Sequence, residues 1–155
     1  MSELDALDAA IVRHLQEDAR IANNVLAARL GIAPSTCHGR VRSLFERGII
    51  RGVHAEVDQA RVGRPLQAMI SVRLRPHARG HLTTFAQAMA ELPEVLNVFF
   101  LAGADDFLVH VATAGSDELR EFVVDHLSSS QDVAMTETSL IFEHLRGRPS
   151  VPRSA

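Results

Sequence analysis

Hydrophobic side chains in the first third of the chain recur every three or four residues, which is the spacing of helices with one buried face. The first such stripe consists of Leu4, Leu7, Ile11 and Leu15. A short second helix holds Leu26 and Leu30, and Gly31 ends it. The pattern therefore predicts two helices before residue 32, and we expect the first to pack behind the later helices.

A third helix begins at Pro34, because the fixed φ of proline suits a first turn. Cys37, Val41 and Leu44 have the spacing of a buried face. The opposite face is polar or small, with Ser35, Gly39 and Arg42 flanked by Thr36, His38 and Ser43. This arrangement is typical of a helix-turn-helix, whose second helix enters the major groove of DNA.

After this motif the pattern changes from helical spacing to alternation. Val53, Ala55 and Val57 alternate with polar residues and predict a half-buried strand. Gly63 and Pro65 then interrupt the pattern. We expect a strand and linker over residues 52–65 that separates a helix-turn-helix domain (1–51) from a second domain.

The second half predicts strands and helices in the order βαββαβ, the ferredoxin-like arrangement. The expected strands cover residues 66–75, 95–101, 107–113 and 133–145, and the helices cover 82–89 and a segment that Ser116 caps. The predicted fold class is α+β, a winged tri-helical helix-turn-helix domain followed by a ferredoxin-like domain over 66–145. We expect residues 146–155 to be a disordered tail.

The segment 95–101 is apolar on both of its faces, so both faces of this strand should be covered. Two helices cover only one face of the sheet. A second copy of the same sheet is the simplest cover for the other, and the pattern therefore predicts a homodimer.

Composition and charge narrow the functional class. No apolar run reaches membrane-spanning length, the acidic N-terminus is unlike a signal peptide, and a single cysteine suits the reducing cytoplasm. Residues 27–64 hold seven arginines and three acids, a net charge of +4, whereas residues 65–155 have a net charge of −4. The positive charge thus lies on the candidate DNA-binding segment, where phosphates attract it.

The chain resembles the Lrp/AsnC family of transcription regulators from about Leu4 to Leu145. The resemblance rests on ordered short motifs, among them Asp18-Ala19-Arg20-Ile21, Pro34-Ser35-Thr36-Cys37, Arg40-Val41 and Gly48-Ile49-Ile50. It implies an N-terminal helix-turn-helix, a C-terminal domain that senses an amino acid, and dimers that assemble further, often to octamers. No cofactor or metal is implied.

Two departures from the family concern helix starts. Ala22 and Ala33 stand where the family usually has serine, and losing such a cap costs roughly 0.5–2 kcal/mol. Asn23 is a substitute cap for the second helix, and Ser35 partly serves the third. Without either, the helix-turn-helix is less stable than in its relatives.

Six residues are candidates for DNA contact: Ser35, Thr36, His38, Gly39, Arg40 and Arg42. Arg42 can donate two hydrogen bonds to a guanine edge, and Ser35 and Thr36 can bond phosphates near the helix start. Gly39 would let the backbone approach DNA closely, with codon drift as the alternative. Arg40 lies nearer the buried flank, where a structural ion pair and a phosphate contact are equally good interpretations.

A second candidate site is the loop Leu101, Ala102, Gly103, Ala104, Asp105 and Asp106, which resembles the family's effector loop together with Phe107. An exposed carboxylate and free backbone groups here could hold the ammonium and carboxylate of an amino acid. The resemblance implies a second wall from a neighbouring dimer, around Met135, Thr136, Glu137 and Thr138. An ordinary acidic turn is the alternative, since Ala104 and Asp105 depart from the family pattern.

Other functions have weaker support. His77 and His81 are spaced for a metal, but Gly80 between them disfavours the necessary helix, and Cys37 lies on a buried face rather than in a reactive site. No catalytic motif is present, so the chain is not expected to be an enzyme. We expect a cytoplasmic regulator that binds double-stranded DNA and responds to an amino acid. The alternatives are an effector-independent regulator and a metabolite-binding module that acts on a protein partner.

Overall fold

The computed structural model describes residues 4–145 and 147. They divide into two compact units, a helical unit that extends to Ala55 and an α+β unit over Glu56–His144. The predicted tail at 146–155 lies outside the described residues apart from Gly147. None of the helices that are described is both long enough and apolar enough to cross a membrane.

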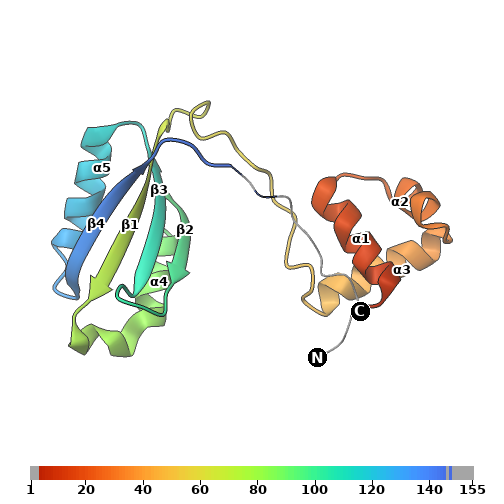
Figure 1. Cartoon of the computed structure of the whole chain (residues 1–155), viewed down its shortest axis with the longest axis horizontal. Helices are drawn as coiled ribbons and strands as arrows, with labels where there is room; N and C mark the ends of the chain where they lie inside the picture. Colours follow the sequence, from red (N-terminus) through yellow and green to blue (C-terminus); the bar gives the residue numbers. More distant parts are fainter. Residues whose placement is uncertain (1–3, 146, 148–155) are drawn as a thin grey trace. The chain divides into compact units, whose positions relative to one another are not determined.

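The helical unit contains the three predicted helices, α1 (Ala6–Glu17), α2 (Asn23–Leu30) and α3 (Pro34–Glu46) (Figure 1). Side chains from all three fill one small core, at whose centre Ile11, Leu26, Cys37 and Leu44 are almost completely buried. Gly31 ends α2 with a φ of +67°, a conformation that suits glycine and few other residues. The helical spacing therefore identified the buried faces correctly.

The starts of these helices differ in how their first backbone N–H groups are bonded. The Asp5 carboxylate caps α1 by accepting a hydrogen bond of 2.7 Å from the Asp8 backbone N–H. Ala22 and Ala33 occupy the N-cap positions of α2 and α3, and neither helix has a side-chain cap. The expected substitutes were wrong, because Asn23 donates to the Pro34 carbonyl and both Asn23 and Ser35 lie inside their helices.

The strand predicted around Val53–Val57 was also wrong. Residues 51–58 form neither helix nor strand, and the side chains of Val53 and Val57 are exposed. Alternation gives a segment two different faces, but a strand also needs a neighbour with which to exchange backbone hydrogen bonds. Among the described residues, no other segment pairs with this one. A turn over residues 59–63 comes next, in which Gly63 has a φ of +87°.

The α+β unit has the predicted βαββαβ order. Its four strands are β1 (Leu66–Leu74), β2 (Val95–Phe100), β3 (Phe107–Thr113) and β4 (Val133–Ile141). They form one antiparallel sheet in the order β2-β3-β1-β4. The last strand ends at Ile141, four residues earlier than predicted.

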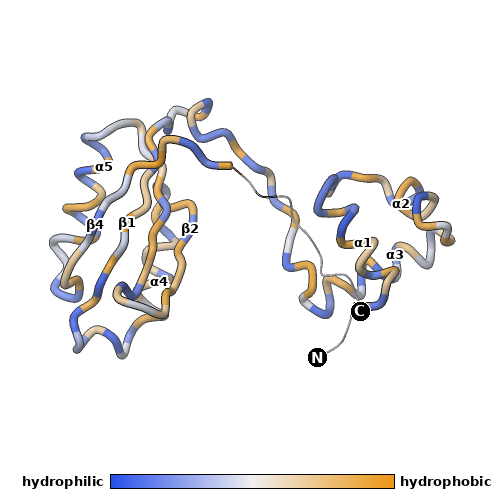
Figure 2. The backbone as a smooth tube through the Cα atoms, in the orientation of Figure 1, coloured by the Kyte–Doolittle hydropathy of each residue, from blue (hydrophilic) through white to orange (hydrophobic). Residues whose placement is uncertain are grey.

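Two helical segments cover one face of this sheet. A 3-10 turn (Pro76–His81) leads into α4 (Leu82–Ala90), and α5 (Ser116–Val123) continues into a π turn (Val124–Ser128). In Figure 1 both α4 and α5 lie behind the sheet. The alternate positions of β1 and β3 that face them are buried with Phe122 and Leu127. Figure 2 shows the amphipathic pattern of α5, where hydrophilic and hydrophobic positions alternate around the helix.

Ser116 does not cap α5, contrary to the prediction. Gly115 occupies the N-cap and Ser116 is the first helical residue. The Glu118 carboxylate instead accepts a hydrogen bond of 2.5 Å from the Ala114 backbone N–H just before the helix. This bond holds the residue before the N-cap and leaves α5 without a side-chain cap.

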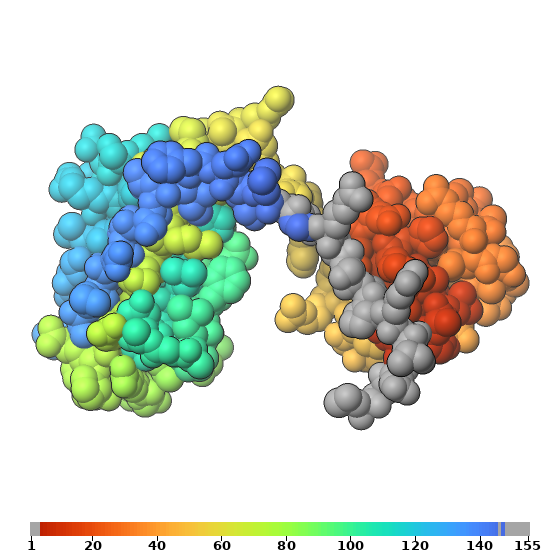
Figure 3. All heavy atoms as spheres, viewed as in Figure 1, coloured from red at the N-terminus to blue at the C-terminus, as the bar shows by residue number. Residues whose placement is uncertain are grey.

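The other face of the sheet, which we call the open face, carries no helix. It is defined by Gln67, Met69, Ser71 and Arg73 of β1 with their neighbours in register on the other strands. Figure 3 shows atoms of β4, β1 and β3 side by side at this surface, with nothing in front of them. Phe99 on the edge strand β2 is 45% exposed. The cover expected for this face is therefore not supplied by the described part of the chain.

Candidate functional site

The polar face of α3 is open to solvent. Ser35, Thr36, His38, Gly39 and Arg42 are all exposed, whereas Cys37 and Leu44 on the opposite side are fully buried. Packing of Cys37 and Leu44 against the other two helices fixes which way α3 is turned. The structure thus brings five of the six predicted DNA contacts to one exposed surface, which we call the recognition face.

Arg42 is the arginine that projects from the middle of the recognition face. Its Nε donates to Glu46 Oε1 at 2.7 Å, one helical turn away, and the two side chains are 74% and 61% exposed. An exposed pair of this kind contributes little to stability. A phosphate or a guanine edge can therefore replace Glu46 at small cost.

Arg40 is held in place by α1. Its Nη1 lies 2.5 Å from Asp5 Oδ2 and 2.9 Å from Asp8 Oδ1, and Arg47 Nη1 lies 2.9 Å from the other oxygen of the buried Asp8. The backbone N–H of Asp8 and then the Arg40 side chain hold the pKa of Asp5 below its usual value. Of the two roles that the sequence left open for Arg40, the structure has the ion pair, which ties α1 to α3.

His38 has a second neighbourhood besides the solvent. It lines a hollow of about 610 Å³ within the helical unit, together with Leu15 of α1 and Val41 and Phe45 of α3.

Cys37 is the only free thiol in the described residues, and burial raises its pKa. A protonated, inaccessible thiol is a poor nucleophile, as its position in the sequence indicated.

The predicted effector loop connects β2 to β3 and is braced by its last residue. The Asp106 N–H donates to Val72 O and the Leu101 N–H to Asp106 O, both at 2.9 Å. Asp106 Oδ2 accepts from the Leu74 N–H at 2.8 Å, and Oδ1 lies 3.5 Å from Arg79 Nε. With 15% of its side chain exposed, Asp106 is a structural brace, so the expectation of an exposed, free carboxylate is wrong for this residue.

The loop's other carboxylate contacts a residue that sequence reasoning missed. Asp105 Oδ1 lies 3.3 Å from Arg73 Nη2, and both side chains are only partly exposed. The signal in the sequence was an arginine at an alternate position near the end of the strand predicted over residues 66–75. Arg73 therefore joins the candidate site.

The second predicted wall lies on β4, next to the same end of β1. Met135 is in register with Arg73, Thr136 with Val72 and Thr138 with Ile70. Met135 and Thr138 are exposed, and Thr136 is half-buried. Met135 therefore lies beside Arg73 on the open face, whereas Thr136 and Thr138 lie on the opposite face of the sheet with Val72 and Ile70. Within one protomer, only Met135 of the predicted second wall borders Arg73.

Two family models match this chain, one over its N-terminal helices and the other over its C-terminal domain. The AsnC-type helix-turn-helix domain matches residues 4–44, and the Lrp/AsnC ligand binding domain matches residues 67–151. The chain belongs to the Lrp/AsnC family. As a member of this family it is a DNA-binding transcriptional regulator with a C-terminal ligand-binding domain, and it is not an enzyme.

Relatives of this Lrp/AsnC regulator match nearly its whole length. The HTH-type transcriptional regulator AldR of Mycobacterium tuberculosis is 55% identical over 146 residues, which are 94% of this chain and 82% of AldR. The leucine-responsive regulatory protein of Rhizobium meliloti is 35% identical and covers 93% of this chain and 92% of its own.

Solved structures agree with this assignment. The crystal structure of M. tuberculosis AldR superposes with a TM-score of 0.84 at 49% identity, covering 94% of this chain and 97% of its own. A regulator from Neisseria meningitidis, solved as a complex with L-Met, gives a TM-score of 0.85 at 31% identity over 97% of both chains.

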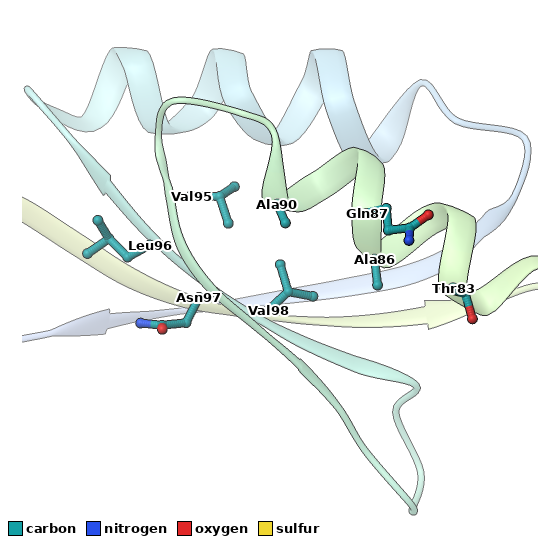
Figure 4. A pocket seen from close by; sticks show the side chains of 8 residues that line it. All are labelled: Thr83, Ala86, Gln87, Ala90, Val95, Leu96, Asn97 and Val98. Carbon is teal, nitrogen blue, oxygen red and sulfur yellow. The ribbon is translucent and has the colours of Figure 1, made fainter. Parts of the chain in front are cut away.

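Two further places in this Lrp/AsnC chain carry no evident chemistry. A groove of about 440 Å³ lies between α4 and β2, where Ala86, Ala90 and Val98 face one another (Figure 4) and no ionisable side chain lines the wall. His77 lies 3.3 Å from Asp132, and His81 joins it in no group of three metal-binding side chains in residues 4–145.

Proposed function

We propose that this regulator reads DNA with the recognition face of α3. The observation that carries the proposal is the exposure of Ser35, Thr36, Gly39 and Arg42 on one side of a helix whose other side is locked into a core. Arg42 is the residue suited to a guanine edge, and the hydroxyls of Ser35 and Thr36 suit phosphates near the start of the helix. His38 is a flanking contact, while Arg40 supports the surface through its pairs with Asp5 and Asp8.

The ligand of the C-terminal unit is, in this proposal, an amino acid. Support comes from the match to a ligand-binding domain and from the N. meningitidis relative solved with L-Met. The site includes the loop residues Leu101–Asp106 and the β4 residues Met135, Thr136 and Thr138 of a neighbouring dimer. Binding between dimers would change their assembly, and through it the affinity for DNA.

The working form is an assembly of dimers in the cytoplasm, an octamer by resemblance to the family. The open face of the sheet supports the dimer, because half-buried Met69 and Leu108 and exposed Phe99 lie there without a cover in the described chain. Two copies joined in this way would present two recognition helices to successive major grooves, about 34 Å apart.

The test for DNA reading replaces Arg42 with alanine and measures operator affinity against salt concentration. We expect R42A to lower affinity by about 1–3 kcal/mol when Arg42 contacts a base, and to relax the preference for that base. R120A removes the same charge from an exposed position on α5 and should leave operator affinity unchanged. If R42A binds the operator with wild-type affinity, the recognition face does not read DNA in the way proposed.

The test for an effector uses the twenty standard L-amino acids one at a time. A saturating effector should raise the melting temperature and also shift either the assembly size or the operator affinity of the wild-type protein. If no amino acid changes any of the three, the regulator is effector-independent. If an amino acid binds while no specific DNA affinity exists, the protein is instead a metabolite-binding module.

A further inference from the structure

Arg73 is the most unusual polar residue of the open face. Its guanidinium group has five N–H donors, yet the contact that ties it to Asp105 measures 3.3 Å. A strong N–H to carboxylate bond is about 2.7–2.9 Å long. Arg73 Nε is buried and has no hydrogen-bond partner in the described part of the protein. Most of the binding capacity of this cation is therefore unused.

Asp105 is correspondingly underused. Its contact with Arg73 joins one carboxylate oxygen to one nitrogen, and its side chain is 28% exposed. Asp106 next to it differs, because both of its oxygens are engaged, one by the Leu74 N–H and the other by Arg79. Of the two acids in the loop, Asp105 is thus the one whose partner can be exchanged without loss of a structural brace.

The surroundings provide further donors. The backbone N–H groups of Ala102, Gly103 and Ala104 donate no hydrogen bond within residues 4–145, and all three residues are exposed. Met135 is in register with Arg73 on the neighbouring strand and lies on the same face. A cation, an anion and an apolar side chain therefore border one place, and the loop that carries the anion also has three free N–H groups.

We propose that the Arg73–Asp105 pair opens to take the zwitterionic end of an α-amino acid. Arg73 then binds the ligand's carboxylate and Asp105 binds its ammonium group. One long ion pair is replaced by two, and the net charge of the site does not change. The inference deepens the proposed effector function, on which it rests, by assigning the two charged groups that read the ligand.

This arrangement makes a clear demand on the ligand. A ligand must carry both a free α-carboxylate and a free α-ammonium group, because binding only one of them leaves Arg73 or Asp105 without its partner in a partly desolvated place. The amide of an amino acid lacks the anion and its N-acetyl derivative lacks the cation. Both derivatives should be rejected although their side chains are unchanged.

The experiment measures ligand affinity by calorimetry for wild type, R73Q and D105N. The ligands are those of the twenty L-amino acids that stabilise the wild type, together with their amides and N-acetyl derivatives. We expect each variant to bind about 10- to 100-fold more weakly, and each derivative to lose a similar factor against wild type. R75Q is the matched control, since Arg75 is an exposed arginine two residues further along and should bind as wild type does.

The outcomes separate this inference from the function on which it rests. If none of the twenty amino acids binds the wild type, the effector function fails and the inference fails with it. If an amino acid binds but R73Q and D105N bind it equally well, or its amide binds as tightly, the pair is not the reader while the effector function stands. Circular dichroism and the ligand-free melting temperature establish that each variant is folded, and D105N keeps the test decisive should R73Q fail to fold.

Discussion

Gly39 stands in the middle of α3, where glycine has a cost. A Cβ built on Gly39 meets no atom within 4 Å, so nothing inside the helical unit requires the missing side chain. Glycine in a helix interior is about 1 kcal/mol less stable than alanine. The position is nevertheless on the recognition face, where a partner from outside could need the space.

We therefore expect G39A to change stability and DNA binding in opposite directions. The free energy of unfolding should rise by about 1 kcal/mol, as denaturant titration would measure. Operator affinity should fall several-fold, because the added methyl group would hold the backbone away from the DNA. Unchanged or tighter operator binding by the stabilised variant would mean that Gly39 reflects codon drift and makes no close approach.

At this scale the sequence predicted the types of residue at each site better than their partners. Arg40 and Arg42 lie two positions apart, and the helical angle alone left the role of Arg40 open until Asp5 and Asp8 were seen beside it. The two acids of the loop differed in the sequence only in how they fit the family pattern, which did not show that Asp106 is a brace and Asp105 is a weakly held partner of Arg73. Such roles depend on residues more than thirty positions away, which a local pattern does not reveal.

At the scale of elements, the N-cap positions of α2 and α3 hold residues whose side chains cannot cap a helix. Ala22 and Ala33 have extended backbone conformations, with ψ of 141° and 143°, from which a serine hydroxyl can reach the first free N–H groups. We expect A22S and A33S each to stabilise the helical unit by about 1 kcal/mol in thermal or denaturant unfolding.

The matched control for these caps is A28S. Ala28 is exposed inside α2, where serine has a lower helix propensity than alanine and no free N–H to bond. A28S should therefore cost a few tenths of a kcal/mol. If A22S and A33S are no more stable than A28S, the N–H groups of the first turns are already satisfied by solvent.

On the open face of the sheet, three side chains joined by hydrogen bonds should make the stability of the protein depend on pH. Asn97 Nδ2 lies 3.3 Å from His110 Nδ1, and His110 Nε2 lies 3.0 Å from Gln67 Oε1. This pattern suits a neutral ring that accepts from Asn97 and donates to Gln67. Burial, and secondly the charge of His144, lower the pKa of His110 below its ordinary value of 6.5.

The lowered pKa of His110 decides whether stability rises or falls with pH. Below about pH 6.5 the unfolded chain binds a proton at this histidine more readily than the folded chain does, so stability falls as the pH decreases. We expect H110Q to lose less stability than wild type between about pH 7.5 and pH 5 in denaturant titrations. H81Q, which replaces an exposed histidine, should keep the wild-type loss. An equal loss in H110Q and wild type would contradict this assignment.

The elements themselves were predictable wherever a pattern and a neighbour coincide. Strands β1 and β3 alternate against helices that the same chain supplies, and their predicted boundaries agree with the structure to within a residue. Residues 53–57 alternate in the same way and form no strand, because pairing needs a partner segment. The cap predicted for α5 was wrong because the helix begins one residue earlier than expected, so that Gly115 is the N-cap and Ser116 is the first helical residue.

For the whole molecule, the division into two units gives the regulator a separate reader and sensor. The residues proposed to read DNA all lie before Ala55, and those proposed to read the ligand all lie between Glu56 and His144. A ligand can then act on DNA binding by changing how many copies are joined, without altering the core of the helical unit.

Leu108 allows this assembly to be tested directly. It lies on β3, an inner strand, and points to the open face in register with Phe99 and Ser71. Because its side chain is only half-buried in the single chain, L108D should leave the fold intact while placing a charge in the centre of the proposed dimer surface. We expect light scattering to show a monomer, and operator affinity to fall by about 100-fold or more, since two linked recognition helices bind far more tightly than one.

A88D adds the same charge to an exposed position on α4 and should leave both the mass and the affinity as in wild type. If L108D keeps the wild-type mass, the dimer does not form through this face, and the exposed side chain of Phe99 needs another explanation.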